Sequence, residues 1–178
     1  MRLAWPFRRD VTRDYAHELY VALSNQARKP AFYAPGRVPD TLAGRFELML
    51  LHAILVVRRL RRAGAPGETL AQVLFDVLFD DMDQALREMG IADLAVSRRI
   101  KRLAAAFYGR AKAYEDALEA GAEPVATALQ RNLFAGAPVD PAILAVFADY
   151  TIVADRSLAG QADAALLTGQ VHFPPPPA

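Results

Sequence analysis

The sequence predicts an all-α fold, a single-domain helical bundle of about six helices. Residues 48–57 are apolar at every position except His52, as in a helix that is buried on all sides. Several other stretches repeat apolar residues at spacings of three and four, and none alternates apolar and polar residues as a half-buried strand does. The length of 178 residues is that of one domain with a substantial core.

Composition narrows the class of protein. A hydrophobic content of 53% with 23% charged residues is that of a globular chain. The net charge of +1 gives no reason to expect DNA as a partner, and the lack of cysteine excludes disulfides and zinc–thiolate sites. The apolar run at 48–57 is too short to span a bilayer, and the N-terminus has no apolar signal region. We therefore expect a soluble intracellular protein.

The first third of the chain is expected to form an arm, two helices and a loop. Residues 1–10 form the arm, whose Trp5 and Phe7 could sit at a membrane interface or pack on the bundle. The first helix runs to about residue 29. The proline-containing loop 30–39 carries two aromatic residues and should therefore fold back on the core. The second helix starts after the capping signal at 39–41 and ends in four arginines, with Gly64 as its C-cap.

Glycines and prolines divide the rest of the chain. The stretch 64–67 is read as a break, so that the third helix opens at Glu68 or Thr69 and ends near residue 89. The fourth helix follows from Asp93 to about residue 120, and a shorter one occupies about 124–134. The last begins at Asp140. The predicted organisation is an arm at 1–10, a helical domain at 11–170 and an extended, mobile proline-rich tail at 171–178.

The third helix carries an acidic stripe. Asp76, Asp80 and Asp83 follow one another at spacings of four and three, and Arg87 lies four further on. A metal would explain three neighbouring carboxylates. An isoprenoid synthase uses such helices in pairs, and no second acidic helix is evident. A solvated stripe, or ion pairs with arginines of a neighbouring helix, is the favoured interpretation.

No residue combination predicts catalysis or a cofactor. His52 lies five residues after Glu47, whereas a di-metal bundle needs Glu and His three apart on each of two helices. We therefore interpret His52 as a hydrogen-bonded core residue. The serines have no glycine elbow, and the chain has no phosphate-binding or dinucleotide-binding motif.

Two basic clusters remain. The first is Arg58, Arg59, Arg61 and Arg62, which the dipole at the end of the second helix favours. The second, in the fourth helix, is Arg98, Arg99, Lys101 and Arg102. Its members could pair with the acids of the third helix. The functional alternative for either cluster is a surface for anionic lipid or ribosomal RNA.

The chain resembles the ubiquinol–cytochrome c chaperone family over roughly residues 15–120. The stretches that carry the resemblance are Phe32-Tyr33-Ala34-Pro35-Gly36-Arg37-Val38-Pro39-Asp40-Thr41, Gly44-Arg45-Phe46-Glu47, Leu51-His52, Leu70-Ala71-Gln72, Leu74-Phe75-Asp76, Asp80-Asp81-Met82-Asp83, Leu86-Arg87-Glu88-Met89-Gly90, Ala106-Phe107-Tyr108-Gly109-Arg110 and Tyr114. The resemblance implies a role in assembly of the cytochrome bc1 complex. Mitochondrial members bind newly made cytochrome b with a partner protein near the ribosomal exit.

From the resemblance we expect an assembly chaperone, not an enzyme, whose client is cytochrome b. An anionic membrane surface and a ribosome are further partners to consider. The alternative is an α-helical lipid- or isoprenoid-binding protein or enzyme that uses the acidic stripe. Since no transit peptide is evident, we expect a bacterial member in the cytoplasm, peripheral at the inner membrane. The candidate client or partner surface is Arg45, Glu47, Asp76, Asp80, Asp83 and Arg87. The candidate membrane contact is Trp5, Phe7, Arg58, Arg59, Arg61 and Arg62.

Overall fold

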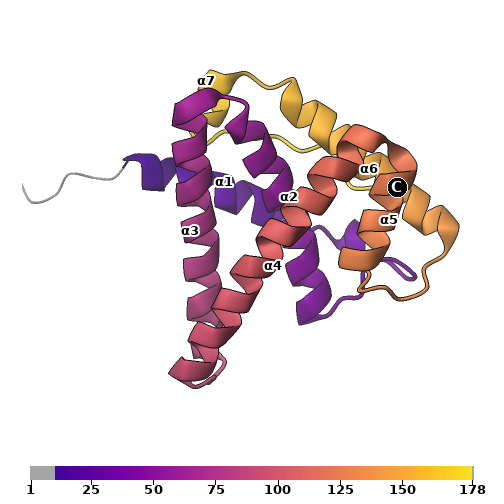
Figure 1. Cartoon of the computed structure of the whole chain (residues 1–178), viewed down its shortest axis with the longest axis horizontal. Helices are drawn as coiled ribbons and strands as arrows, with labels where there is room; N and C mark the ends of the chain where they lie inside the picture. The colour runs from indigo at the N-terminus through magenta and orange to yellow at the C-terminus, as the bar shows by residue number, and fades with distance from the viewer. Residues whose placement is uncertain (1–10, 178) are drawn as a thin grey trace, which may run out of the picture.

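The computed structural model describes residues 11–177, and over that range it is helical with no strand (Figure 1). The helices are α1 (Val11–Ala27), the 3-10 helix η1 (Pro30–Tyr33), α2 (Leu42–Arg61), α3 (Gly64–Glu88), α4 (Asp93–Ala120), α5 (Ala122–Asn132), α6 (Pro141–Ala159) and α7 (Asp163–Leu166). Six of them have eleven residues or more, so the all-α prediction is confirmed. The four-residue α7 has no counterpart among the predicted helices.

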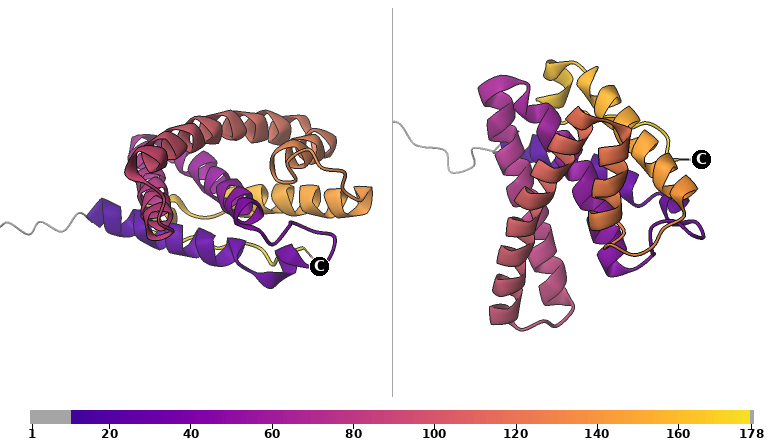
Figure 2. Two further views of the ribbon diagram at one scale, coloured as in Figure 1. Left: turned by 90° about the horizontal axis from the view of Figure 1, so that it is seen from below. Right: turned by 45° about the vertical axis from the view of Figure 1, so that its right-hand side comes forward.

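Helix α2 lies at the centre of the bundle, as its apolar run predicts. It packs against α1, α3, α4 and α6, which surround it in the view from below in Figure 2. Leu50 is 0% exposed and Ile54 is 1% exposed, which confirms both as core residues. Helix α2 begins as expected, because the side chain of Thr41 accepts a hydrogen bond from the backbone N–H of Gly44 at 3.1 Å.

The predicted break before α3 is wrong, because α3 starts at Gly64, ahead of Glu68 and Thr69. Pro66 lies in the first turn, where its missing N–H costs the helix nothing. Gly67 is needed there for space: a Cβ atom at this position would lie 2.0 Å from the carbonyl oxygen of Leu60. Close packing against the end of α2 therefore explains the glycine that sequence reasoning took for a breaker.

The loop after α1 folds back on the core, as predicted. Phe32 is fully buried, with its ring edge-on to His52 at 5.5 Å and to Tyr150 at 5.1 Å between centroids. Burial of a large aromatic side chain fixes the path of the loop.

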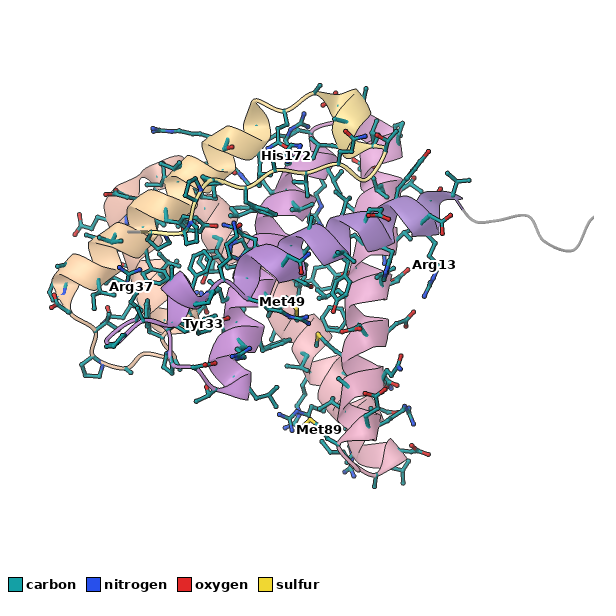
Figure 3. All side chains as sticks on the ribbon, turned by 180° about the vertical axis from the view of Figure 1, so that it is seen from behind. Arg13, Tyr33, Arg37, Met49, Met89 and His172 are labelled. Carbon is teal, nitrogen blue, oxygen red and sulfur yellow. The ribbon has the colours of Figure 1, made fainter. Side chains whose placement is uncertain are left out.

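The C-terminal segment is extended, as predicted, but it is packed and not a free tail. Phe173 lies edge-on to His52 at 5.2 Å, and Gln26 donates a hydrogen bond to the carbonyl oxygen of Pro174 at 2.9 Å. Arg37 donates to the carbonyl oxygen of Pro177 at 2.8 Å. Figure 3, seen from behind, shows the segment crossing from His172 toward Arg37. Sequence reasoning missed this because prolines without a periodic pattern give no sign of what they pack against.

His52 is a hydrogen-bonded core residue, as predicted. Its Nδ1–H donates to the carbonyl oxygen of Leu48 at 2.8 Å, because a carbonyl can only accept. Its Nε2 then accepts from the Tyr150 hydroxyl at 2.7 Å, and that hydroxyl accepts from Gln26 at 2.9 Å. Burial lowers the pKa of His52 to about 4, so the ring is neutral at pH 7.

Candidate functional site

A cleft of about 760 Å³ opens where α1, α2, α3 and α4 meet. Its lining residues are Tyr20, Ser24, Ala27, Arg28, Tyr33, Leu42, Ala43, Arg45, Phe46, Glu47, Met49, Asp81, Met82, Ala85, Leu86, Met89, Arg99 and Leu103. The cleft is open to solvent, since Leu42 is 57% exposed and Met89 is 60% exposed. Figure 3 labels Tyr33, Met49 and Met89 on this side of the molecule.

The apolar part of the cleft is rich in methionine. Met49 comes from α2, Met82 from α3 and Met89 from the C-cap of α3, so all three methionines among the described residues line the cleft. Methionine has an unbranched, flexible and polarisable side chain, which adapts to apolar partners of different shapes. This lining suits an apolar chain segment better than one rigid small molecule.

Polar groups at the rim are held in place by partners within the chain. The Tyr20 hydroxyl donates a short hydrogen bond to the Asp81 carboxylate. Burial, and secondly this hydrogen bond, raise the pKa of Tyr20 to about 12, so the hydroxyl stays protonated and remains a donor. The contact therefore joins α1 to α3 and fixes one acidic group at the edge of the cleft.

Two residues of the candidate partner surface line the cleft. Arg45 pairs with Asp40 at 2.5 Å and lies over the ring of Tyr33 at 5.2 Å. Glu47 accepts two hydrogen bonds from Arg110, at 2.7 and 2.5 Å, which tie α2 to α4. Burial raises the pKa of Glu47, and the Arg110 guanidinium opposes that rise. Arg45 is therefore a half-exposed, paired cation at the rim, whereas Glu47 is part of the wall.

The acidic stripe does not contribute to the described lining of the cleft. Asp80 pairs with Arg13 of α1 at 2.7 Å, which confirms the favoured interpretation of an ion pair with a neighbouring helix. Asp76 accepts a hydrogen bond from Gln72 at 2.9 Å.

The remaining two residues of the candidate partner surface also lie outside the cleft lining. Asp83 pairs with Arg87 at 2.5 Å, and Arg87 also pairs with Asp93 at the start of α4. The structure therefore brings together only two of the six predicted partner residues, Arg45 and Glu47. Within residues 11–177 no three His, Asp or Glu side chains are grouped as a metal site would require.

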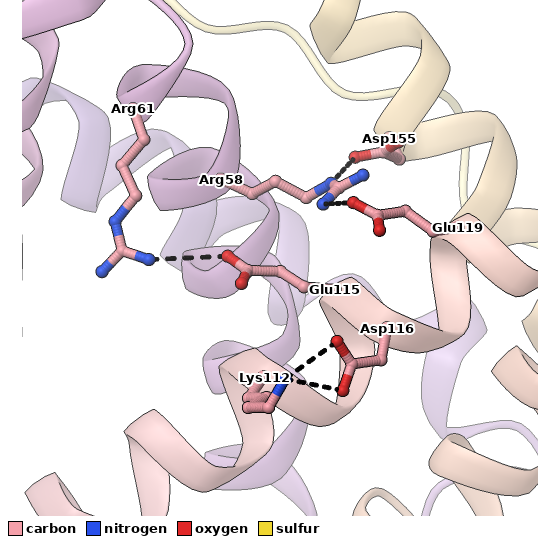
Figure 4. A network of polar contacts seen from close by, with 7 residues as sticks. All are labelled: Arg58, Arg61, Lys112, Glu115, Asp116, Glu119 and Asp155. Carbon is pink, nitrogen blue, oxygen red and sulfur yellow. Dashed lines mark hydrogen bonds and ion pairs between the residues drawn. The ribbon is translucent and has the colours of Figure 1, made fainter.

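Two members of the first basic cluster, Arg58 and Arg59, are internal, which does not fit their assignment as membrane contacts. The side chains of Arg58 and Arg59 are only 10% and 8% exposed. Arg58 bonds Asp155 of α6 at 3.1 Å and Glu119 of α4 at 3.4 Å, as Figure 4 shows. At this end of α2, Arg58 therefore forms ion pairs with acidic residues of two other helices.

Arg59 and Arg61 also have partners within the fold. Arg59 donates to the carbonyl oxygens of Leu158 at 3.0 Å and Gln161 at 2.6 Å, and to Asp163 at 2.5 Å. Arg61 reaches Glu115 at 3.5 Å and is about half exposed, and Arg62 is exposed. Trp5 and Phe7, the other predicted membrane contacts, lie outside the described residues.

The second basic cluster is exposed, and the expected ion pairs with the acids of α3 do not form among the described residues. Arg98, Arg99, Lys101 and Arg102 are all exposed. Within residues 11–177, Arg98 is the one member whose side chain makes a hydrogen bond, to the carbonyl oxygen of Leu94 in its own helix at 3.3 Å.

Sequence reasoning did not predict the cleft itself. Its strongest signal was the run Met82, Leu86, Met89, whose spacing of four and three puts two methionines on one helical face. Nothing in the sequence shows that α1 and α2 leave this face partly uncovered.

An all-α bundle with an open, methionine-lined cleft is the class of protein that these features define. Residues 36–173 match the family model described as ubiquinol-cytochrome C chaperone. The chain therefore belongs to the ubiquinol–cytochrome c chaperone family, and the match continues well beyond residue 120, where the recognised motifs ended.

The fold also matches a solved structure. The crystal structure of the Cbp3 homolog from Brucella abortus superposes with a TM-score of 0.82 at 34% identity, covering 93% of this chain and 91% of that one. Ubiquinol-cytochrome c reductase complex assembly factor 1 from Mus musculus and from Homo sapiens are each 23% identical over 90% of this chain. The chain spans about half the length of these two relatives, 55% and 54% respectively. The corresponding Xenopus laevis protein is 24% identical, and the chain covers 80% of its length.

Over residues 11–177, none of the helices has both the length and the hydropathy needed to cross a bilayer.

Proposed function

We propose that this protein is an assembly chaperone for the cytochrome bc1 complex, and that it holds an apolar segment of newly made cytochrome b in the cleft. The methionine-lined cleft is the observation that carries the proposal. Its apolar floor is formed by flexible side chains, and its rim holds polar groups in fixed positions. An apolar segment with polar flanks would find partners for both parts there.

Family membership supports the choice of client. The mouse and human relatives are named as assembly factors of the ubiquinol–cytochrome c reductase complex. Cytochrome b is a membrane subunit with long apolar segments, and such segments need protection from water before insertion. The proposal requires neither a ribosome nor a second chaperone subunit. We propose a location in the bacterial cytoplasm, and the higher sequence identity to the Brucella abortus structure than to the vertebrate relatives supports this proposal.

We infer that the role is one of binding and not catalysis. The three aspartates that an enzyme of the isoprenoid type would use are Asp76, Asp80 and Asp83. They have separate partners, and the described lining of the cleft includes none of them.

The test is recovery of cytochrome b with the tagged protein from solubilised membranes, comparing two variants. Ala85 is exposed and lines the cleft on α3, whereas Ala145 is exposed on α6 and is not among the lining residues. Ala85→Asp puts a charge where an apolar segment would bind, and a buried unpaired carboxylate is costly. We expect at least about tenfold less cytochrome b with Ala85→Asp, equivalent to about 1.4 kcal/mol, and no change with Ala145→Asp.

Equal recovery with both variants would contradict binding in the cleft. Absence of cytochrome b from every sample, including the unmodified chain, would contradict the choice of client. Circular dichroism of both variants serves as the check that each is folded.

A further inference from the structure

The turn that joins α3 to α4 carries the two most exposed large apolar side chains of the described chain. Leu94 is 79% exposed and Met89 is 60% exposed. The turn is the lowest point of the molecule in Figure 1 and projects away from the other helices in the right-hand view of Figure 2. An exposed apolar patch rimmed by polar residues marks a site of interaction with a protein or a membrane, whereas a single exposed apolar side chain needs no explanation.

Helix α4, which follows the turn, continues this exposed surface along one of its faces. Leu94, Arg98, Lys101, Ala105 and Tyr108 follow one another at spacings of four and three, and all five are exposed. We call these five residues the outer stripe of α4. The opposite face of α4 holds its buried residues, which are Val96, Phe107, Ala111, Tyr114 and Ala117. The stripe therefore has the exposed Leu94 at one end and cations in its middle, and it ends at Tyr108, whose half-exposed ring stacks on Phe75 of α3 at 5.4 Å.

The cations of the stripe are not neutralised by the surrounding acids. Within residues 11–177, Arg98 and Lys101 make no ion pair, and neither does the adjacent Arg102. Of the acids at this end of the hairpin, Asp83 and Asp93 both pair with Arg87. Glu88 beside them accepts a hydrogen bond from Gln84. The stripe is consequently a positive surface on a chain of net charge +1.

We propose that the outer stripe of α4, together with Met89, lies on the surface of an anionic lipid bilayer. Cations next to exposed apolar side chains are typical of a helix in the membrane interface, where phosphates meet acyl chains. The charge of the stripe complements anionic headgroups, and Leu94 and Met89 leave water for the apolar layer. RNA would satisfy the cations but would leave these two side chains in water.

The location of the stripe links the membrane to the cleft. Met89 and Arg99 line the cleft and lie at the same end of the α3–α4 hairpin. A hairpin resting on the bilayer therefore brings the mouth of the cleft to the level at which an apolar segment enters or leaves the membrane. The membrane contact itself does not depend on which client the cleft binds.

The test measures co-sedimentation with vesicles of phosphatidylglycerol and phosphatidylcholine at low salt, with pure phosphatidylcholine as the neutral surface. The hairpin variant reverses Arg98, Lys101 and Arg102 to Glu. The control variant reverses Arg62, Arg131 and Arg156, which are exposed outside α4, and changes the net charge by the same amount. We expect the hairpin variant to lose at least about 100-fold in affinity for the anionic vesicles, since each basic residue contributes strongly near such a surface. The control variant should lose less than about tenfold in this affinity, and high salt should weaken vesicle binding by the wild type.

Leu94→Asn with Met89→Asn separates lipid from nucleic acid, with polyuridylate as the RNA probe. A bilayer contact predicts weaker vesicle binding by this double variant. Unchanged vesicle binding with weaker RNA binding would overturn the proposal, and so would equal loss by the two charge-reversal variants. Full binding by the hairpin variant would also overturn it and would assign the contact to another part of the chain, such as the arm at residues 1–10.

Discussion

The two basic clusters of this protein look alike in sequence and have opposite environments. Arg58 and Arg59 at the end of α2 point into the fold, where they meet Asp155 and Asp163. Arg98 and Lys101 in the first half of α4 point out of it. The first pair ties helices together, and the second leaves its charge free for a partner. The role of a run of arginines can thus be assigned only when its neighbours in space are known.

The difference has a simple physical origin. The end of α2 is surrounded by later parts of the chain, and charges enclosed in this way must be paired if the fold is to be stable. The first half of α4 packs mainly on α3 and extends beyond the other helices (Figure 1). Its outer side is hydrated, so unpaired cations cost little there.

The largest effect is expected at Arg59. Arg59→Ala removes three hydrogen bonds, and the part-buried carbonyl oxygen of Gln161 loses its donor, whereas that of Leu158 keeps the backbone N–H of Gln161. An unsatisfied buried acceptor costs about 1–3 kcal/mol, and the lost packing of the arginine stem adds to it. We expect the free energy of unfolding in urea to fall by about 2–4 kcal/mol. A fall of under about 0.5 kcal/mol, as at surface sites, would show that Arg59 is not an internal tie.

A second, intermediate effect concerns His52, because burial keeps this base neutral. The pKa of His52 is lowered to about 4 from its ordinary value of 6.5. Between these two values the unfolded chain binds more protons than the folded one, so stability falls as the pH falls. The expected slope is up to about 1.4 kcal/mol per pH unit, and it ends near the folded pKa.

Urea unfolding at pH 7, 6 and 5 measures this slope, with His52→Gln as the variant that cannot take up the proton. Glutamine can still donate to the carbonyl oxygen of Leu48. The difference in stability between wild type and variant should shrink as the pH falls from 6.5 toward 4. A constant difference over that range would contradict the assignment of a neutral, buried ring.

The smallest effects are expected at exposed cations of both clusters. Arg61 is about half exposed and only 3.5 Å from Glu115, so Arg61→Ala should cost no more than about 1 kcal/mol. Arg98→Ala should change the free energy of unfolding by under about 0.5 kcal/mol. Chemical denaturation measures these losses of stability, which should decrease in the order Arg59, Arg61, Arg98. Any other order would contradict the proposed difference between the two clusters.

Much of the fold could be predicted from the sequence, because apolar spacing reports which face of a helix is buried. The central position of α2, the core role of Leu50 and the return of Phe32 to the core are all confirmed. The start of α3 could not be predicted, because Gly67 is required by its close approach to the carbonyl oxygen of Leu60 in another helix. The packing of Phe173 on His52 is similarly a contact between distant parts of the chain.

The site could be predicted only in part, for the same reason. Arg45 and Glu47 fall in the cleft, but the cleft exists because four helices leave a gap there. Arg58 was interpreted as a surface charge because its partners Glu119 and Asp155 lie far away in sequence. Apolar periodicity predicts which face of a helix is buried, but it does not predict which residues of other helices that face contacts.

Site-specific photocrosslinking tests the central claim, client binding in the cleft, most directly. A photoreactive amino acid replaces Ala85 in the cleft or Ala145 on α6 while cytochrome b is being synthesised. The account predicts a crosslinked product with cytochrome b from position 85 and none from position 145. A product from position 145 alone, or from neither position, would contradict it.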